Sequence, residues 1–156
     1  MDIDNIGAAL GKIPSGVFIA TSSIDGDEVG MLASFVEQAG FNPPTITAAI
    51  GVDRRLNQAI EESGMIGINI LGEEDARLMK PFNQQENLSP FTSLELDDNE
   101  FNLPQLTEAL AFLACKITGK IEGGDHIIYA AEVVDGILND PSSSPMVRVR
   151  KNGFQY

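Results

Sequence analysis

The chain has 156 residues and a formal net charge of -13, from 23 Asp and Glu against 10 Lys and Arg. Its length suits a single domain over residues 1–156, and its 43% hydrophobic content excludes a disordered chain. The charge argues against nucleic acid and against an anionic membrane surface as partners, while one Cys and one His exclude a disulfide framework and a usual zinc site.

Targeting and membrane signals are not visible in the sequence. No apolar run approaches the roughly 18 residues of a membrane-spanning helix. The acidic start Met1-Asp2-Ile3-Asp4 lacks the basic and apolar regions of a signal peptide. We therefore expect a cytoplasmic location.

The first third of the chain predicts a helix followed by strands. Apolar residues at Ile3, Ile6 and Leu10 have the spacing of a short amphipathic helix. β-branched and apolar stretches then predict three strands, over 16–22, 29–38 and 45–52. Asp25-Gly26 gives a hairpin signal between the first two strands, and Asn42-Pro43-Pro44 interrupts the chain before the third.

The rest of the chain alternates between the two periodicities. Helices are predicted over 53–63 and from the acidic run 73–75 to about Pro81, with a strand over 65–71 between them. The acidic stretch 81–104 predicts a long surface excursion. Further strands are predicted over 109–121, 126–138 and 146–149. Six or seven strands in hairpin-type connections indicate a mainly β fold with inserted helices, in which an antiparallel sheet closes into a barrel.

Most catalytic constellations are missing from the sequence. Neither Gly-x-Gly-x-x-Gly nor a P-loop is present, which argues against a Rossmann-type cofactor site, and local sequence suggests no Ser-His-Asp or Cys-His arrangement. Cys115 lies in an apolar strand and is best interpreted as a buried structural thiol. The acidic side chains follow no metal-loop spacing and indicate a solvated surface; they include Asp53, Glu61, Glu62, Asp97 and Asp98.

Two local features suggest cofactor binding. Arg54 and Arg55 stand where a buried strand turns into a helix, and a helix N-terminus with guanidinium groups is suited to phosphate. The alternative is a surface pair bonded to Glu61 or Glu62. The second feature is Gly124-Asp125-His126, a turn that delivers the only imidazole to the start of a strand. A lone His is more often structural, so this signal is weak by itself.

In order along the chain, these features resemble the flavin reductase-like FMN-binding split-barrel family. The resemblance covers nearly the whole chain and rests on an ordered set of segments: 10–17, Met31-Leu32-Ala33-Ser34-Phe35-Val36, Asn42-Pro43-Pro44, 54–64, Asn69, Cys115-Lys116, Gly124-Asp125-His126 and 145–156. Within the family, segments 31–39 and 52–54 most resemble the C-terminal flavin reductase domain of cyanobacterial flavodiiron (diflavin) proteins. The chain lacks the other domains of those proteins, so it is either a free-standing relative or an excised domain.

The resemblance implies a homodimeric, six-stranded antiparallel FMN-binding split barrel with the flavin near the subunit interface. Carried over by position, Ala33, Ser34, Phe35 and Val36 approach the isoalloxazine ring. By the same resemblance, the ribityl phosphate is surrounded by Gly51, Arg54, Arg55, Leu56 and Asn57. Arg54 supplies the positive charge, and Arg55 is at a variable position of the family. His126 is implied to lie beside the flavin, where a nicotinamide stacks, and to position it rather than react covalently.

One residue departs from the family pattern. Glu37 stands where relatives usually have a small polar residue. A carboxylate facing the flavin should disfavour the reduced anionic form and weaken binding, whereas an outward one should have no effect. Strand alternation places Phe35 and Glu37 on one face and Ser34 and Val36 on the other, which leaves both readings open.

The resemblance implies an NAD(P)H-dependent FMN reductase that passes hydride from a nicotinamide to FMN. Electrons then go to a second flavin, a flavodiiron-type metal partner or oxygen. The alternative is an FMN-binding electron-transfer module that does not oxidise NAD(P)H directly. Positive charge is scarce and clustered, at Arg54 and Arg55 and near the C-terminus at Arg148, Arg150 and Lys151, and such clusters suit an anionic cofactor and dinucleotide.

Overall fold

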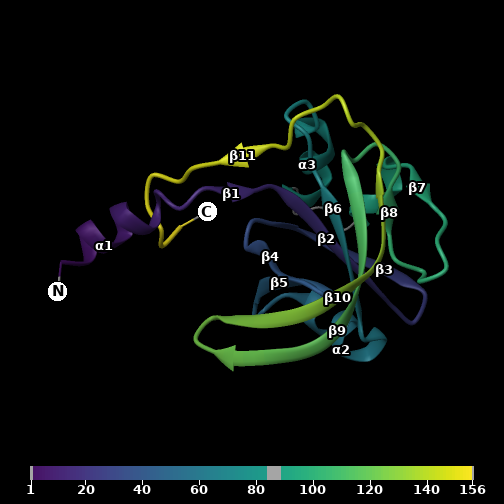
Figure 1. Ribbon diagram of the computed structural model, residues 1–156, viewed down its shortest axis with the longest axis horizontal. Coiled ribbons are helices and arrows are strands. Elements are labelled where there is room, and N and C mark those ends of the chain that lie inside the picture. The colour runs from purple at the N-terminus through teal and green to yellow at the C-terminus, as the bar shows by residue number, and fades with distance from the viewer. Residues whose placement is uncertain (1, 84–88, 156) are drawn as a thin grey trace.

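A computed structural model describes residues 2–83 and 89–155, and a strongly bent antiparallel sheet is its main feature (Figure 1). Seven strands of the described residues form this sheet in the order β3-β2-β6-β9-β10-β5-β4, with every neighbouring pair antiparallel. Their bounds are β2 Phe18–Ile24, β3 Asp27–Ala33, β4 Val36–Phe41, β5 Pro44–Gly51, β6 Met65–Ile70, β9 Ala111–Gly123 and β10 His126–Leu138. The predicted mainly β fold class is confirmed.

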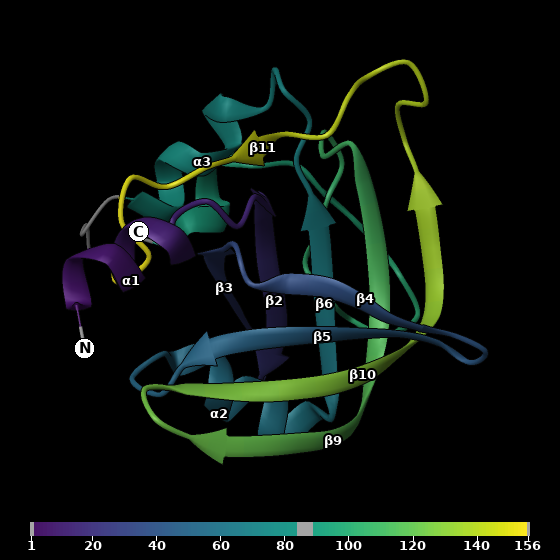
Figure 2. The same ribbon diagram turned by 60° about the vertical axis from the view of Figure 1, so that its left-hand side comes forward.

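The barrel is split at Ser34-Phe35. The strand predicted over 29–38 is in fact two strands, β3 and β4, which lie at opposite edges of the sheet although only two residues separate them. The six long strands predicted from the sequence therefore account for all seven strands of the sheet. The two edge strands β3 and β4 are not hydrogen-bonded neighbours in the sheet, and only the chain itself connects them at this corner (Figure 2).

Local sequence signals explain the first two helices. Helix α1 (Ile3–Leu10) matches the predicted bounds, and the Asp2 side chain caps it by accepting from the Asn5 amide at 3.1 Å. Helix α2 (Arg55–Ser63) ends at Gly64, whose φ of 70° is the left-handed conformation that glycine tolerates best. Asp25 and Gly26 both have positive φ in the β2–β3 turn, which confirms the predicted hairpin.

The segment before α3 (Ala76–Asn83) differs from its prediction. The acidic run 73–75 does not begin the helix, because Asp75 forms a turn first. Its carboxylate accepts from the Gly72 amide at 2.6 Å, and its own amide donates to the Gly72 carbonyl at 3.0 Å. Pro81 lies inside the last turn of α3.

The stretch 81–104 is more than a surface excursion, although residues 84–88 of it lie outside the described part. It contains the 3-10 helix η1 (Pro90–Ser93) and β7 (Leu96–Asp97), which pairs with β8 (Gln105–Leu106). Phe91 and Leu103 are buried, in separate apolar clusters. The Pro104 carbonyl accepts from Thr21 at 2.8 Å and from Asn69 at 3.2 Å. The C-terminal end of this stretch is therefore hydrogen-bonded to the core of the barrel.

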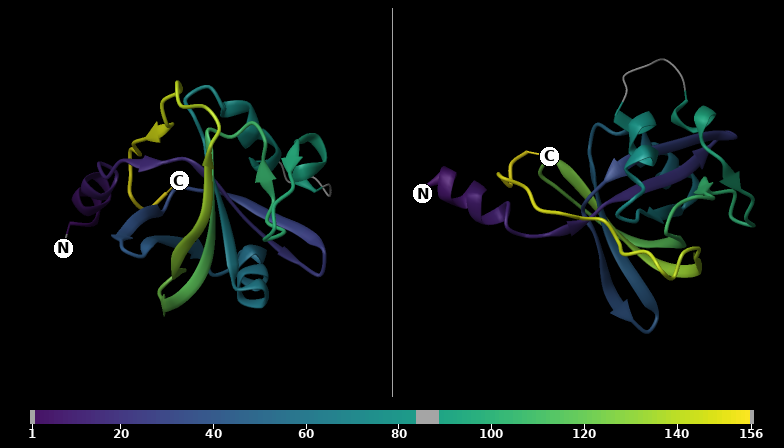
Figure 3. Two further views of the ribbon diagram at one scale, coloured as in Figure 1. Left: turned by 45° about the vertical axis from the view of Figure 1, so that its right-hand side comes forward. Right: turned by 90° about the horizontal axis from the view of Figure 1, so that it is seen from above.

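Both ends of the chain leave the barrel together. In Figures 1 and 3, α1 projects to one side with the C-terminal tail beside it. Strand β11 (Val147–Arg148) pairs with β1 (Ser15–Gly16), and the Gly153 amide donates to the Gly7 carbonyl at 2.7 Å. Gly153 packs so closely on Leu10 that a side chain would not fit there. Among the described residues, no helix is long and apolar enough to cross a bilayer.

Candidate functional site

Two cavities meet at Ser34, the residue at the split of the barrel. The first, here called the cationic cavity, has a volume of about 190 Å³ and is lined by Met31, Leu32, Ser34, Arg54, Phe82, Asn83 and Arg148. The second, here called the apolar cavity, has a volume of about 380 Å³. Its lining consists of Leu10, Ile13, Pro14, Ser15, Ser34, Phe35, Glu37, Thr47, Ala49, Ile128, Arg150 and Gly153.

Arg54 reaches the cationic cavity from the start of α2. It is the residue before the first helical turn, and its own amide donates to the Gly51 carbonyl at 3.1 Å. Its Nε lies 3.7 Å from Asp53 Oδ1, beyond hydrogen-bonding distance, and 53% of the side chain is exposed. Arg54 itself provides no side-chain cap for the helix. The positive end of α2 and a lightly engaged guanidinium therefore coincide at this cavity.

Arg55 takes a different direction from Arg54. Its Nη2 donates to Asp27 Oδ2 at 3.0 Å, which ties the start of α2 to the β2–β3 hairpin. The alternative pairing with Glu61 or Glu62 is wrong, because Lys120 contacts Glu61 at 3.0 Å and the two arginines face Asp27 and Asp53.

Leu56 and Asn57 are buried, and their side chains serve the fold. Leu56 belongs to the main core cluster. Asn57 donates to the Gly51 carbonyl at 2.7 Å and accepts from the Tyr129 hydroxyl at 3.1 Å. The same hydroxyl lies 3.2 Å from Glu61 Oε1, and burial, with a smaller contribution from Glu61, raises the pKa of Tyr129 to about 12. This network fixes Gly51, the residue from which the chain turns towards Arg54.

Phe35, which lines the apolar cavity, packs against His126. Their ring centroids are 5.6 Å apart in an edge-to-face arrangement, and the guanidinium carbon of Arg150 lies 5.0 Å from the Phe35 centroid. His126 Nδ1 and Asp125 Oδ1 are 2.8 Å apart, and this hydrogen bond lowers the pKa of the Asp125 carboxyl. His126 also pairs with Gly51 across the β5–β10 ladder, so the sheet brings the two ends of the predicted site together.

The remaining predicted residues divide between core and cavity. Ala33 and Val36 are buried in the main core cluster and line neither cavity, so the structure does not bring their side chains into the candidate site. Glu37 lines the apolar cavity together with Phe35 and also with Ser34, which strand alternation would place on the opposite face. Sequence reasoning did not predict Met31, Leu32 or Phe82 as lining residues. It noted Arg148 and Arg150 only as part of a charge cluster.

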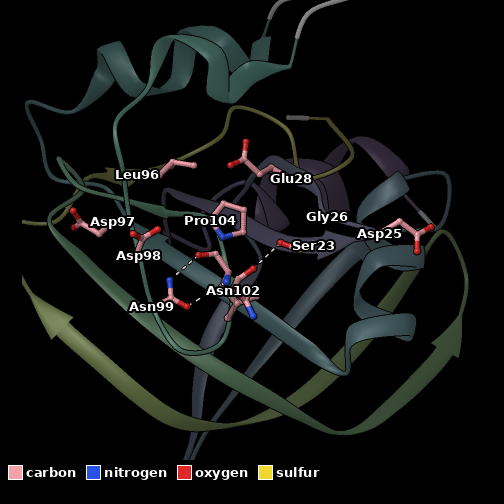
Figure 4. A pocket seen from close by; sticks show the side chains of 11 residues that line it. Ser23, Asp25, Gly26, Glu28, Leu96, Asp97, Asp98, Asn99, Asn102 and Pro104 are labelled. Atoms are coloured by element: carbon pink, nitrogen blue, oxygen red, sulfur yellow. Dashed lines mark hydrogen bonds between the residues drawn. The ribbon is translucent and has the colours of Figure 1, made fainter.

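A third cavity, of about 460 Å³, has the opposite electrostatic character (Figure 4). Its carboxylates come from Asp25, Glu28, Asp97 and Asp98. The Ser23 hydroxyl donates to the Asn102 carbonyl at 2.7 Å and helps to hold its wall. Within the described ranges, no three His, Cys, Asp or Glu side chains gather as a metal site requires. An anionic ligand is repelled here, whereas arginines line both cavities at Ser34, and these two cavities are the candidate site.

Comparisons with known proteins show which family the chain resembles. The profile of the flavin reductase like domain matches residues 10–155. A putative diflavin flavoprotein A of Nostoc is 32% identical over 95% of this chain and 26% of its own length, so the chain spans about a quarter of such relatives. The reductase component of a 4-nitrophenol monooxygenase from Rhodococcus opacus is 33% identical over 81% of this chain and 67% of its own.

A solved structure supports the fold independently. An NADH:FAD oxidoreductase of Streptomyces globisporus, in complex with NAD and FAD fragments, superposes with a TM-score of 0.83 at 23% identity. The match covers 94% of this chain and 86% of that one. Since the family profile spans nearly all of the sequence and the split barrel is shared, the chain belongs to the flavin reductase-like domain family.

Proposed function

We propose that this chain is an NAD(P)H-dependent FMN reductase whose flavin lies across Ser34. The observation that carries the proposal is the meeting of two unlike cavities at this residue. One presents Arg54 and Arg148, and the other presents the Phe35 ring and aliphatic side chains. A flavin mononucleotide has the same division, with a dianionic phosphate at one end and a flat, largely apolar ring at the other.

The residues present fit such a group. Arg54 and the N-terminus of α2 would hold the phosphate, by charge-assisted hydrogen bonds and the helix dipole. The Ser34 hydroxyl and the backbone of residues 33–36 would face the polar edge of the ring, because Ala33 and Val36 are buried. The chemistry that a bound flavin supplies is acceptance of hydride from a nicotinamide and onward transfer of electrons.

His126 would position the reactants in this scheme. The Asp125 carboxylate fixes the imidazole of His126 at Nδ1. The His126 and Phe35 rings pack in an edge-to-face arrangement. Such a held aromatic pair limits where a nicotinamide can stack and excludes water from that side. We assign His126 this positioning role, without a covalent step.

A homodimer belongs to the same proposal. The arm formed by the two chain ends exposes Ile13, Val147, Val149 and Phe154, each by more than half, and the apolar cavity opens beside the arm residues Leu10 and Ile13. A second copy that packed on this arm would cover apolar surface and close the ring end of the site. The onward electron acceptor is proposed to be a second flavin, a flavodiiron-type metal partner or oxygen.

One observation favours a second candidate, an FMN-binding electron-transfer module without direct NAD(P)H oxidation. Glu37 lines the apolar cavity, and its carboxylate would repel an anionic dinucleotide that approaches the ring from this side. In this reading the flavin would receive its electrons from a protein donor.

Steady-state oxidation of NADH and of NADPH, with and without added FMN, separates the two candidates. The reductase should consume at least one nucleotide at a rate that depends on FMN, and Glu37→Gln should lower KM for it. If the parent protein and the Glu37→Gln variant both bind FMN but neither oxidises a nucleotide, the result would support the electron-transfer module. A folded protein that takes up no FMN would refute both.

A further inference from the structure

We propose that Arg148, on the C-terminal strand β11, is a second phosphate ligand that acts together with Arg54. The inference rests on the proposed function, because it assigns a further binding residue to the same flavin. It also makes the C-terminal segment part of the site, and it specifies the ligand class as a flavin that ends in a phosphate monoester.

The position of Arg148 is fixed by its backbone. Arg148 pairs with Ser15 in the β1–β11 ladder, and just before it the Met146 amide donates to the Leu71 carbonyl at 2.8 Å. Together with the Glu73 amide, which donates to the Ser144 carbonyl at 2.9 Å, this bond forms an isolated bridge between Gly72 and Pro145. These contacts bring the Arg148 side chain to the cavity that Arg54 lines, although the two residues come from distant parts of the chain.

The other arginines are engaged elsewhere. Arg55 bonds to Asp27, and Arg77 forms a two-pronged pair with Glu108. Arg150 lies over the Phe35 ring and donates to the Gly153 carbonyl at 3.2 Å.

The two arginines at the cationic cavity are less committed. Arg54 has the long Asp53 contact at 3.7 Å, and within residues 2–83 and 89–155 no carboxylate lies within ion-pair distance of Arg148. Of the five arginines in the sequence, the two with capacity for a new anion line the same cavity.

The charge and the size of the cavity both match a phosphate monoester. Such a group carries about 1.5 to 2 negative charges at neutral pH, and two guanidinium forks can each bind two of its oxygens. The volume of about 190 Å³ is below the roughly 300–1,000 Å³ of whole-ligand pockets, so it suits one end of a ligand. The flavin ring is left to the larger, apolar cavity on the other side of Ser34.

Titration of FMN and of riboflavin, followed by flavin fluorescence, tests the assignment because the two ligands differ only by the phosphate. Arg148→Gln should weaken FMN binding about 10- to 100-fold, the loss expected for a charge-assisted contact, and should change riboflavin binding by less than about twofold. Arg54→Gln should behave in the same way. The double variant should bind FMN and riboflavin almost equally.

Lys151→Gln is the matched control. It removes one positive charge from the same exposed segment, but Lys151 does not line the cationic cavity. Its FMN affinity should remain within about twofold of the parent protein, measured at the same ionic strength because phosphate binding is sensitive to salt. Thermal melts of all variants should coincide, since Arg148 is exposed and is held in β11 by backbone bonds.

Each alternative result has a distinct meaning. Suppose that the parent protein prefers FMN to riboflavin, that Arg54→Gln removes this preference, and that Arg148→Gln keeps it. In that case the inference about Arg148 is overturned, whereas the proposed function stands. If Lys151→Gln weakens FMN as much as Arg148→Gln, the effect is general attraction and the inference is again overturned. If the parent protein binds neither flavin, the proposed function itself fails.

Discussion

Replacement of Asn57 by Ala distinguishes a fold-supporting residue from a phosphate ligand. The sequence resemblance places Asn57 at the phosphate end of the site, whereas in the structure its side chain is buried and joins Gly51 to Tyr129. Asn57→Ala removes both hydrogen bonds. It leaves the Tyr129 hydroxyl with Glu61 as a partner, and it leaves the Gly51 carbonyl with the Arg54 amide.

The expected loss follows from those contacts. Two hydrogen bonds at about 0.5–1.5 kcal/mol each contribute about 1–3 kcal/mol, and the vacated space beside α2 adds to this. We therefore expect Asn57→Ala to lower the free energy of unfolding by about 2–4 kcal/mol. Because the Gly51 turn carries Arg54, FMN affinity should also fall, but by less than in Arg54→Ala.

Equilibrium unfolding in urea measures the effect, with Gln58→Ala as the matched control. Gln58 is the next residue of the same helix, and its side chain bonds only to Glu62 in the described structure, at 3.3 Å. Its replacement should change the unfolding free energy by less than about 0.5 kcal/mol. Equal stability of the two variants, together with a selective loss of FMN binding in Asn57→Ala, would refute the structural role and restore Asn57 as a ligand.

Other buried or positioned groups give further tests. Burial raises the pKa of Cys115 to about 12, so iodoacetamide at pH 8 should modify the urea-unfolded protein and spare the folded one. Because this pKa is raised from 9.0, the contribution of the neutral Cys115 thiol to stability is complete below pH 9 and is lost by about 1.4 kcal/mol per pH unit between pH 9 and about pH 12, a slope that Cys115→Ala should reduce. Asn69→Ala should cost about 2–4 kcal/mol in urea unfolding, since it leaves the Leu106 amide without its buried acceptor and removes the side-chain bonds to the Ile19 and Pro104 carbonyls. His126→Ala should lower kcat/KM for the nicotinamide about tenfold and change FMN affinity by less than about threefold; the reverse pattern in a stopped-flow and titration comparison would contradict its positioning role.

The sequence predicts the parts of the fold that depend on short-range pattern. The hairpin at Asp25-Gly26 is specified by two adjacent residues, and the apolar periods of α1 and α2 are visible within one window. The break at Ser34-Phe35 is hidden, because β3 and β4 form one uninterrupted stretch of strand-like residues. What splits the stretch is closure of the barrel, a property of the whole sheet.

The error over residues 81–104 has a related cause. Polar and acidic composition there predicts solvent exposure, yet Phe91 and Leu103 insert into separate core clusters, and Leu94, Leu96 and Phe101 pack against those clusters. These apolar residues occur in ones and twos, which are too few to establish a period. The partners of this stretch come from elements far away in the chain, such as Thr21, which bonds to the Pro104 carbonyl.

The candidate site divides in the same way. Arg54 is predictable as a candidate phosphate ligand because its place at a strand-to-helix junction is visible from the neighbouring residues of the sequence. The engagement of Arg55 with Asp27, and that of Asn57 with Tyr129, depends on which hairpin and which strand fold against α2. The approach of Arg148 to Arg54 is likewise a tertiary result, set by the pairing of β11 with β1.

The proposed reductase function is best tested by the visible spectrum of the purified protein, titrated with FMN and then with NADH or NADPH without oxygen. We expect saturable FMN uptake with a perturbed flavin spectrum, followed by bleaching of the oxidised flavin band when at least one of the nucleotides is added. A folded protein in whose presence the added FMN keeps the spectrum of free flavin throughout the titration would contradict the proposed function.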